Sequence, residues 1–445
     1  MTSLKSSLRD PILAIVLGGA LVIRLIAVPV VHQLGFTSDE REFVFLANGI
    51  LQGTGFVDSN GTESVRAPFF PLVLAAALYL DSGAYALAHI LGVLLGVLGV
   101  WLIFQLSFAV FNNRQIALWA TVLAAFYPGL VTYSAMMQTE TLFIVFFLLA
   151  MLLLQRFLEA PRVSVAVLLG LCSGLAGMTR AVFVPFFPLL LLVLLVLRLR
   201  SGWVWVRQIL IAAFAFIIVL LPWGIRNYGI HQRVVPVSTF AGPSLLLGNN
   251  PFTTGTTRLQ DGFNQWFFES VEGKTGRSPE ELSEIQRADI SREIAVEYIT
   301  AHPRRFGELL LRKSHVLLIY PITNSDSYVP AQLVAVIADG FLLLLATAGL
   351  VLASCGRRAM WGLVAVCAFF VGAHVVLHAE ARYRLPLVPL LCVLGGAGAA
   401  GLLSVEGRKR LLESRGQATR LALIWFAIVA LYGATGWMFL HGSVT

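Results

Sequence analysis

Residues 36–71 read FTSDEREFVFLANGILQGTGFVDSNGTESVRAPFFP, and they lie between two apolar runs. Two adjacent carboxylates, Asp39 and Glu40, begin a segment whose apolar residues recur at helical spacing on one face. A glycine-rich turn follows, and Arg66 then precedes a run of aromatic residues bracketed by prolines. This order places acidic residues beside a membrane span, then an amphipathic helix, then a basic residue one loop later. It indicates an active site at a bilayer surface.

These residues also have a plain structural explanation. Acids that follow a membrane span are often solvated, and Asp39 would favour the positive end of the helix after it. The remainder of the chain is needed to decide between the two readings.

The composition is that of a multi-pass membrane protein. Hydrophobic residues make up 58% of the 445 residues and charged residues only 13%, and the mean hydropathy is +0.81. Soluble domains have fewer hydrophobic and more charged residues than this. The net charge of +8 comes from basic residues scattered among short loops, which indicates membrane orientation and not nucleic-acid binding. The four cysteines show no CxxC spacing, so we expect neither a disulfide nor a zinc site.

Apolar runs long enough to span a bilayer number eleven. No cleavage site follows the first of them, so we expect an uncleaved span there. The eleven runs cover residues 11–31, 84–111, 116–134, 141–158, 163–179, 181–198, 208–224, 331–353, 360–378, 385–404 and 421–440.

A further apolar run at 68–80 is too short to cross, with only about a dozen apolar residues. If it lies on the outer surface, the basic clusters of later loops face the cytoplasm; if it crosses, they face outward, against the positive-inside rule. We therefore predict an all-α fold of about eleven transmembrane helices with interfacial helices on the outer face. The N-terminus is then cytoplasmic and the C-terminus outside.

The chain divides into three parts in this reading. The first outer loop, 32–83, carries the acidic pair and belongs to the first part. The parts are an N-terminal transmembrane core at 1–224, an outer region with amphipathic helices at 225–330, and C-terminal transmembrane helices at 331–445.

The outer region contains two predicted helices. The tetrad Ser278-Pro279-Glu280-Glu281 has the pattern of a capping box and predicts a helix over 279–300. A second helix is predicted over 303–319, along the membrane interface. Upstream, the turn-rich segment GPSLLLGNNPFTTG at 242–255 is expected to be a loop.

Polar residues gather on the predicted outer face. Charges at span ends are commonly anchors whose heads reach the lipid headgroups, and Arg24 would reach the outer surface or pair with Asp39. Glu140 and Glu380 are harder to explain as anchors, because they lie in short turns on the side that needs no anchoring charge. The whole set is Asp39, Glu40, Arg66, Glu140, Arg180, Arg226, Glu380, Arg382, Tyr383 and Arg384.

The order of these motifs resembles that of the GT-C superfamily of membrane glycosyltransferases, which includes protein O-mannosyltransferases and the lipid A aminoarabinose transferase. SDEREFVFLANGILQGTGF resembles the family's first-loop acidic pair with its interfacial helix. RAPFFPLVLA resembles the start of the second interfacial helix, with Ala67 where proline is usual. QTETLF, GMTRAVFVPFFP, LPWGIRN and EARYRLPLVP resemble later motifs. The resemblance covers most of 1–250 and 370–400, and residues 250–330 point to no particular subfamily.

The resemblance implies transfer of a sugar, with inversion, from a polyprenyl-phosphate carrier to a lipid, glycan or protein acceptor. The site would face outward from the cytoplasmic membrane. Phosphate is a good leaving group, so such a site needs a base for the acceptor hydroxyl and cations for the phosphate. The implied roles are Asp39 as base beside Glu40, Arg66, Arg180 and Arg226 on the donor phosphate, Glu140 on the acceptor, and Glu380, Arg382, Tyr383 and Arg384 on substrate. A Mg²⁺ or Mn²⁺ ion shared by Asp39 and Glu140 is left open.

Three other functions fit parts of the pattern. A flippase or transporter of lipid-linked sugars would carry charges deep in its spans on both leaflets, whereas these gather on one side. No internal repeat stands out, which also disfavours a repeat-built transporter. A polymerase or ligase that uses diphosphate-linked oligosaccharides stays open. A scaffold without activity is disfavoured by the retained acids.

Overall fold

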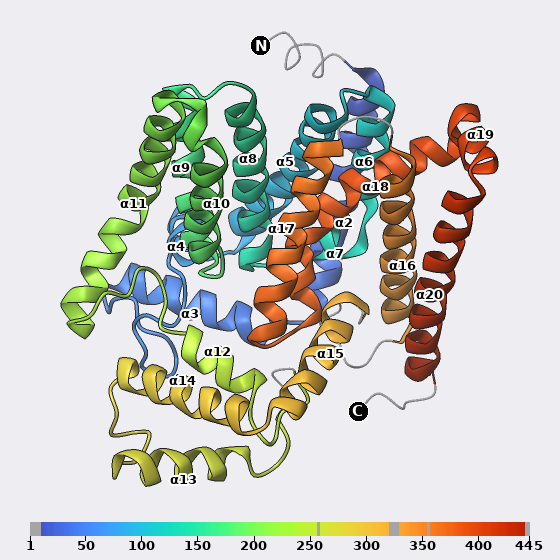
Figure 1. Ribbon diagram of the computed structural model, residues 1–445. Coiled ribbons are helices and arrows are strands. Elements are labelled where there is room, and N and C mark those ends of the chain that lie inside the picture. Colours follow the sequence, from blue (N-terminus) through green and yellow to red (C-terminus); the bar gives the residue numbers. More distant parts are fainter. Residues whose placement is uncertain (1–9, 256–258, 320–328, 354–356, 441–445) are drawn as a thin grey trace.

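The computed structural model describes residues 10–255, 259–319, 329–353 and 357–440, and these fold almost entirely into helices (Figure 1). Within these ranges, the β pairing consists of a single isolated bridge between Thr253 and Leu259. The predicted all-α class is confirmed.

The first half of the chain builds most of the helical bundle. Its helices are α2 (Pro11–Gln33), α3 (Ser38–Gln52), α4 (Phe69–Leu80), α5 (Ala86–Phe111), α6 (Arg114–Phe126), α7 (Pro128–Ala135), α8 (Thr139–Glu159), α9 (Val163–Thr179), α10 (Phe183–Arg198), the 3₁₀ turn η1 (Leu199–Ser201) and α11 (Trp203–His231).

The second half adds the helices of residues 225–330 and completes the bundle. Its helices are α12 (Ala241–Gly248), α13 (Phe263–Thr275), α14 (Glu284–Ala301), α15 (Pro303–Ile319), α16 (Val329–Leu352), α17 (Arg357–Val376), the 3₁₀ segment η2 (Ala381–Leu387), α18 (Val388–Leu403), α19 (Val405–Glu413) and α20 (Arg415–Leu440).

Nine helices in the described ranges are long and apolar enough to cross a bilayer, or ten if α6 and α7 form one span. Those two helices are bent by 55°, because Tyr127 takes an extended conformation ahead of Pro128, the first residue of α7. At 17 residues, α9 is short for a full span. The predicted count of eleven is therefore not confirmed, since it took 116–134 as straight and 163–179 as full length.

The bend between α6 and α7 explains Arg24, whose predicted position is wrong. Arg24 is fully buried in α2, and its Nη1 donates to the carbonyl oxygens of Ala20 at 3.0 Å and Ala125 at 2.9 Å. The carbonyl at Ala125 belongs to the last turn of α6, where the helix offers it no partner. Arg24 therefore stabilises a break in the bundle, and it neither reaches the surface nor pairs with Asp39.

The first interfacial segment folds as predicted. Thr37 and Glu40 form a capping box that begins α3, and Gly53 ends it in the left-handed conformation, with φ of 74°. Residues of α3 and α4, among them Phe43, Leu46, Leu74 and Leu78, share one buried apolar cluster. In Figure 1, α3 crosses the lower end of the bundle, with α12, α14 and α13 beyond it. The place of α4 on the membrane surface stays a prediction.

The outer region differs from expectation in two places. The capping box is Ser283 with Gln286, so α14 begins at Glu284, and residues 278–281 form a turn. Part of the expected loop 242–255 is the helix α12. It packs so closely on α14 that a Cβ on Gly242 would lie 2.0 Å from the Ala288 carbonyl oxygen. Tertiary packing thus decides these two elements, while α15 has the predicted bounds 303–319.

Candidate active site

Asp39 is held between two arginines from distant parts of the chain. It lies in the first turn of α3. Its Oδ1 accepts from Arg66 Nη2 at 2.9 Å, and its Oδ2 accepts from Arg382 Nη1 at 2.5 Å. Arg66 lies three residues before α4, and Arg382 lies in η2. The two predicted motifs therefore meet at one carboxylate.

A second acid–arginine pair lies beside the first. Glu140, in the first turn of α8, accepts from Arg180 Nη1 at 2.9 Å through Oε1. Arg180 lies at the turn between α9 and α10, as predicted. Both side chains are largely buried, with exposed fractions of 4% for Glu140 and 12% for Arg180. The positive end of α8 further favours a carboxylate at this position.

Tyr383 joins the two pairs into one site. Its ring centroid lies 5.4 Å from the guanidinium carbon of Arg180 and 5.7 Å from that of Arg382, within the range of cation–π attraction. Glu380 Oε2 lies 2.6 Å from Arg382 Nε. We name the resulting group the carboxylate–arginine cluster; its members are Asp39, Arg66, Glu140, Arg180, Glu380, Arg382 and Tyr383.

The electrostatics of Asp39 follow from this pairing. Burial raises the pKa of its carboxyl, but the charges of Arg382 and Arg66 outweigh that effect and hold the pKa below its ordinary 3.8. Asp39 is therefore ionised at neutral pH and is a poor proton acceptor while both guanidinium groups hold it. An anion that draws the arginines away would make it a better base.

Glu40 has a structural environment. Its Oε2 accepts from the backbone N–H and the hydroxyl of Thr37, at 3.0 and 2.9 Å. Its Oε1 accepts from the Met137 backbone N–H at 3.0 Å. Glu40 thereby caps α3 and ties it to the turn before α8, and its side chain is buried. This geometry gives no support to the predicted role of Glu40 beside the base.

Arg226 lies apart from the carboxylate–arginine cluster, in contrast to its predicted grouping. Its guanidinium donates to the carbonyl oxygens of Glu63 and Phe56, at 2.9 and 3.1 Å, and lies 4.4 Å from the Trp223 ring. Arg226 therefore holds the first outer loop against the end of α11.

Arg384 also lies apart from the cluster. It forms a buried ion pair with Asp339 of α16 and donates to the Leu317 carbonyl oxygen at 2.8 Å. Asp339 also accepts from the Tyr127 hydroxyl. In a 3₁₀ segment with three residues per turn, side chains two apart point to different sides. This geometry separates Arg384 from Arg382, which the sequence motif had grouped together.

The donors present do not fit a divalent metal ion. Within the described ranges, no three His, Cys, Asp or Glu side chains are placed to hold one. Both oxygens of Asp39 face guanidinium groups, and Glu140 faces Arg180. Arginine side chains supply the positive charge here, so the reaction proposed below has no step through a metal.

Two histidines of the late motif were not among the predicted site residues. His378 contacts Tyr383 Oη through Nε2 at 2.9 Å and Ser244 Oγ through Nδ1 at 2.7 Å. The ring of His374 stacks on Tyr383 with centroids 4.6 Å apart. The sequence signal for them was present, since both histidines lie just ahead of EARYR.

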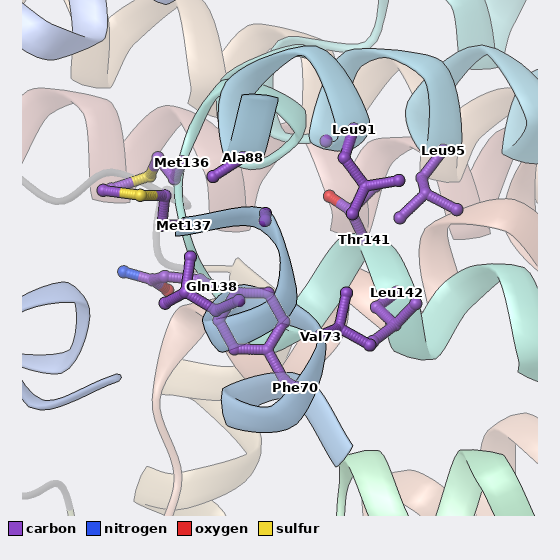
Figure 2. A pocket seen from close by; sticks show the side chains of 13 residues that line it. Phe70, Val73, Ala88, Leu91, Leu95, Met136, Met137, Gln138, Thr141 and Leu142 are labelled. Atoms are coloured by element: carbon purple, nitrogen blue, oxygen red, sulfur yellow. The ribbon is translucent and has the colours of Figure 1, made fainter. Parts of the chain in front are cut away.

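An apolar cavity lies behind the site, between α4, α5 and the turn before α8 (Figure 2). Figure 2 shows side chains of α4 and α5 facing one another, with the turn 136–138 along one side. In that turn the Met137 backbone N–H donates to Glu40 Oε1 at 3.0 Å, and Gln138 Nε2 donates to Thr37 Oγ1 at 2.9 Å. The apolar wall therefore reaches the residues that support Asp39. The labelled lining residues are Phe70, Val73, Ala88, Leu91, Leu95, Met136, Met137, Gln138, Thr141 and Leu142.

Comparison with families of known proteins gives a match over residues 65–225, to the dolichyl-phosphate-mannose-protein mannosyltransferases. A search of curated proteins gives no match.

Solved structures with similar folds include the archaeal oligosaccharyltransferase AglB from Archaeoglobus fulgidus, in complex with an inhibitory peptide and a dolichol-phosphate. It is 14% identical, with a TM-score of 0.50 over 94% of this chain and 56% of AglB. ArnT from Cupriavidus metallidurans bound to undecaprenyl phosphate is also 14% identical, with a TM-score of 0.43 over 87% of this chain and 77% of ArnT.

The likeness to AglB concerns the fold, and this chain spans a little over half of AglB's length, at 56%. The matched family segment 65–225 contains Arg66, Glu140 and Arg180 of the carboxylate–arginine cluster. The predicted resemblance to GT-C membrane glycosyltransferases is confirmed as a resemblance: this multi-pass membrane protein matches a mannosyltransferase family over residues 65–225 and is similar in fold to AglB.

Proposed function

We propose that the protein transfers a sugar from a polyprenyl-phosphate carrier to an acceptor hydroxyl at the carboxylate–arginine cluster. The acceptor is a lipid, a glycan or a protein, and the reaction faces outward from the cytoplasmic membrane. The observation that carries the proposal is the binding of Asp39 by both Arg66 and Arg382, with Arg180 joined to them across Tyr383.

The arginines suit a phosphate ester. A phosphate presents oxygens at a spacing similar to that of a carboxylate, and guanidinium groups bind either one with charge-assisted hydrogen bonds. In this structure the oxygens of Asp39 occupy the donors of Arg66 and Arg382. A carrier phosphate would compete for those donors. AglB, which has this fold, was crystallised with a dolichol-phosphate, and that supports a lipid phosphate as ligand.

Displacement of Asp39 from its arginines would prepare it as the base. When the guanidinium groups bind the phosphate instead, their charges no longer offset the effect of burial on the Asp39 carboxyl, so its pKa rises. Asp39 would then take the proton of the acceptor hydroxyl as its oxygen bonds to the anomeric carbon. The bond from that carbon to the phosphate oxygen breaks, and its electron pair leaves with the phosphate.

Catalysis in this scheme needs no general acid. The negative charge that grows on the departing phosphate is stabilised by the arginines already in place. A single displacement with no enzyme nucleophile inverts the configuration at the anomeric carbon. The apolar cavity between α4 and α5 offers a surface for the first prenyl units of the carrier.

Buried charges inside the spans bear on the transporter alternative. Arg24, Asp339 and Arg384 lie in helices that qualify as spans. Arg24 donates to backbone carbonyls, and Asp339 pairs with Arg384. Each charge thus has fixed partners in the packed bundle, and none lines the apolar cavity of Figure 2. We therefore favour the transferase over a flippase.

The test uses purified full-length protein in lipid nanodiscs with a panel of radiolabelled polyprenyl-phosphate sugars and a membrane extract as acceptor. We expect loss of label from one carrier, appearance of an inverted glycoside, and none of this in Asp39→Asn. Carrier movement across sealed vesicles without any transfer would instead establish the transporter. Neither binding nor transfer with any carrier would refute the proposal.

A further inference from the structure

We propose that His378 is a positioning residue, which fixes the Tyr383 ring between Arg180 and Arg382 and is itself fixed by Ser244 of the outer region. The inference rests on the proposed function, because it concerns the geometry of the arginines assigned to the carrier phosphate. It adds a role for α12 in the reaction.

A continuous chain of contacts carries the inference. Ser244 Oγ lies 2.7 Å from His378 Nδ1, and His378 Nε2 lies 2.9 Å from Tyr383 Oη. Ser244 and His378 are buried, Tyr383 is half-buried, and the ring of His374 stacks on Tyr383. Tyr383 thus has its hydroxyl and one ring contact fixed, which leaves the ring little freedom to move.

The contacts fit a neutral imidazole. Each ring nitrogen faces a hydroxyl group, Tyr383 Oη at Nε2 and Ser244 Oγ at Nδ1, so in either tautomer one nitrogen donates and the other accepts. Burial lowers the pKa of His378, and the nearby Arg382 lowers it further, which agrees with a neutral ring. A protonated ring would donate at both nitrogens, so one of the two hydroxyl contacts would change direction.

The turn that carries His378 is clamped by the outer region. A Cβ on Gly248 would lie 1.8 Å from the Leu377 carbonyl oxygen, so α12 rests directly on this backbone. The Ala379 N–H donates to the Gly255 carbonyl oxygen at 3.1 Å. Lys313 of α15 is fully buried, and its Nζ donates to the Leu377 carbonyl oxygen at 2.9 Å. A displacement of α12 would therefore move His378 and, through it, Tyr383.

The consequence is that the outer region sets the position of two guanidinium groups. Arg180 and Arg382 contact opposite ends of the site and share the Tyr383 ring. Charge on the departing phosphate grows as the bond breaks, so misplaced guanidinium groups affect the chemical step more than ground-state binding. The expected signature is a change in kcat at constant KM for the acceptor.

Two substitutions of His378 separate its two contacts. His378→Asn keeps a polar atom near Nδ1 for Ser244 and loses the contact with Tyr383. His378→Gln places an amide near Nε2 and keeps the Tyr383 contact. We expect His378→Asn to lower kcat by about 5- to 10-fold, the size of one lost hydrogen bond, and His378→Gln to restore most of it.

A double-mutant cycle with Tyr383→Phe decides whether His378 acts through the tyrosine. We expect His378→Asn and Tyr383→Phe together to be no slower than Tyr383→Phe alone. The cycle is measured in the full-length protein as kcat and as affinity for polyprenyl phosphate, with the melting temperature of every variant as the folding control.

Two results would overturn the inference alone while the proposed function stands. In the first, the wild type binds the carrier and transfers the sugar, and the reductions of kcat by His378→Asn and by Tyr383→Phe multiply in the double variant. The other is a His378→Asn protein with a lowered melting temperature and unchanged kcat. A wild type that neither binds polyprenyl phosphate nor transfers a sugar would overturn the proposed function, and this inference with it.

Discussion

Asp39 and Arg382 are 343 residues apart in the chain, and their side chains form an ion pair of 2.5 Å. The pair joins the first outer loop to the short 3₁₀ segment between α17 and α18. The N-terminal family match at 65–225 contains neither residue. The candidate site is therefore a product of the whole fold, and the C-terminal helices are part of it.

Substitution of Asp39 by asparagine tests the base directly. An amide keeps the shape and cannot take the acceptor's proton, so we expect turnover to fall by about 10²–10⁴-fold. Carrier affinity should hold or rise, because Arg66 and Arg382 no longer have a carboxylate competitor. Turnover and carrier binding are measured at matched expression. Near wild-type turnover in Asp39→Asn, with an inactive Glu140→Gln, would move the base to Glu140.

Arg180 is expected to act on both binding and rate. Arg180→Ala should weaken carrier affinity and slow transfer, whereas Arg180→Lys keeps the charge without the bidentate fork and should retain partial activity. Because Arg180→Ala also strips Glu140 of its cation, the double variant with Glu140→Gln removes that charge and isolates the effect on the carrier. The exposed Arg233→Ala is the matched control. Equal carrier affinity in all these variants would make Arg180 an anchor only.

Most members of the carboxylate–arginine cluster could be named from the sequence, whereas their partners could not, for a physical reason. Charges such as Asp39, Glu140 and Arg180 stand out in an apolar chain, and the helical spacing after Thr37 follows local rules. Partner choice between distant residues has no local signal. Arg382 and Arg384 look alike in sequence, yet one meets Asp39 and the other Asp339.

The predicted helix boundaries were wrong where tertiary contacts override local sequence patterns. The segment around Gly242 and Gly248 looks like a loop, but these glycines let α12 press against the backbones of α14 and residue 377. The turn at Ser278 has a capping pattern, yet the cap of α14 is Ser283, which carries the same pattern five residues later, and the helix begins at Glu284. From the sequence, Arg24 resembles a surface anchor. In the structure it is buried, because the break before Pro128 leaves carbonyl oxygens to which Arg24 donates.

Glu40 is expected to matter for stability more than for chemistry. Glu40→Ala removes the capping box and leaves the Met137 N–H without its acceptor, at a cost of about 2–4 kcal/mol for a lost cap and an unsatisfied buried donor together. Differential scanning fluorimetry in detergent should show a lowered melting temperature, with residual transfer in the folded fraction. Glu42→Ala, two residues after Glu40 and in an exposed contact with Ser59, serves as the control. An unchanged melting temperature with abolished transfer would return Glu40 to the reaction.

The pH dependence of the two kinetic constants should differ. In the free protein the pKa of Asp39 lies below 3.8, so its share of stability is present above an unfolded pKa of about 3.9 and is lost as pH falls through the folded value. The same ionised form is the one that accepts a proton, so activity falls on the acid side. Because kcat/KM reports the free protein, its acid limb lies below 3.8. The acid limb of kcat should lie at higher pH, because the arginines then bind the phosphate and the pKa of Asp39 in the complex is higher than in the free protein. Coincident limbs would mean that Asp39 keeps its arginines throughout the reaction.

The orientation of the chain is testable at two exposed serines. If α4 lies on the outer surface, Ser82 after it faces outward, and Ser201 in the turn after α10 faces the cytoplasm, together with most basic loops. In a variant without its native cysteines, Ser82→Cys should react with an impermeant maleimide in intact cells, and Ser201→Cys should react after permeabilisation. Labelling of Ser201→Cys but not of Ser82→Cys in intact cells would mean that the whole bundle has the opposite orientation. That result would place the carboxylate–arginine cluster on the cytoplasmic side and exclude the outward-facing reaction proposed here.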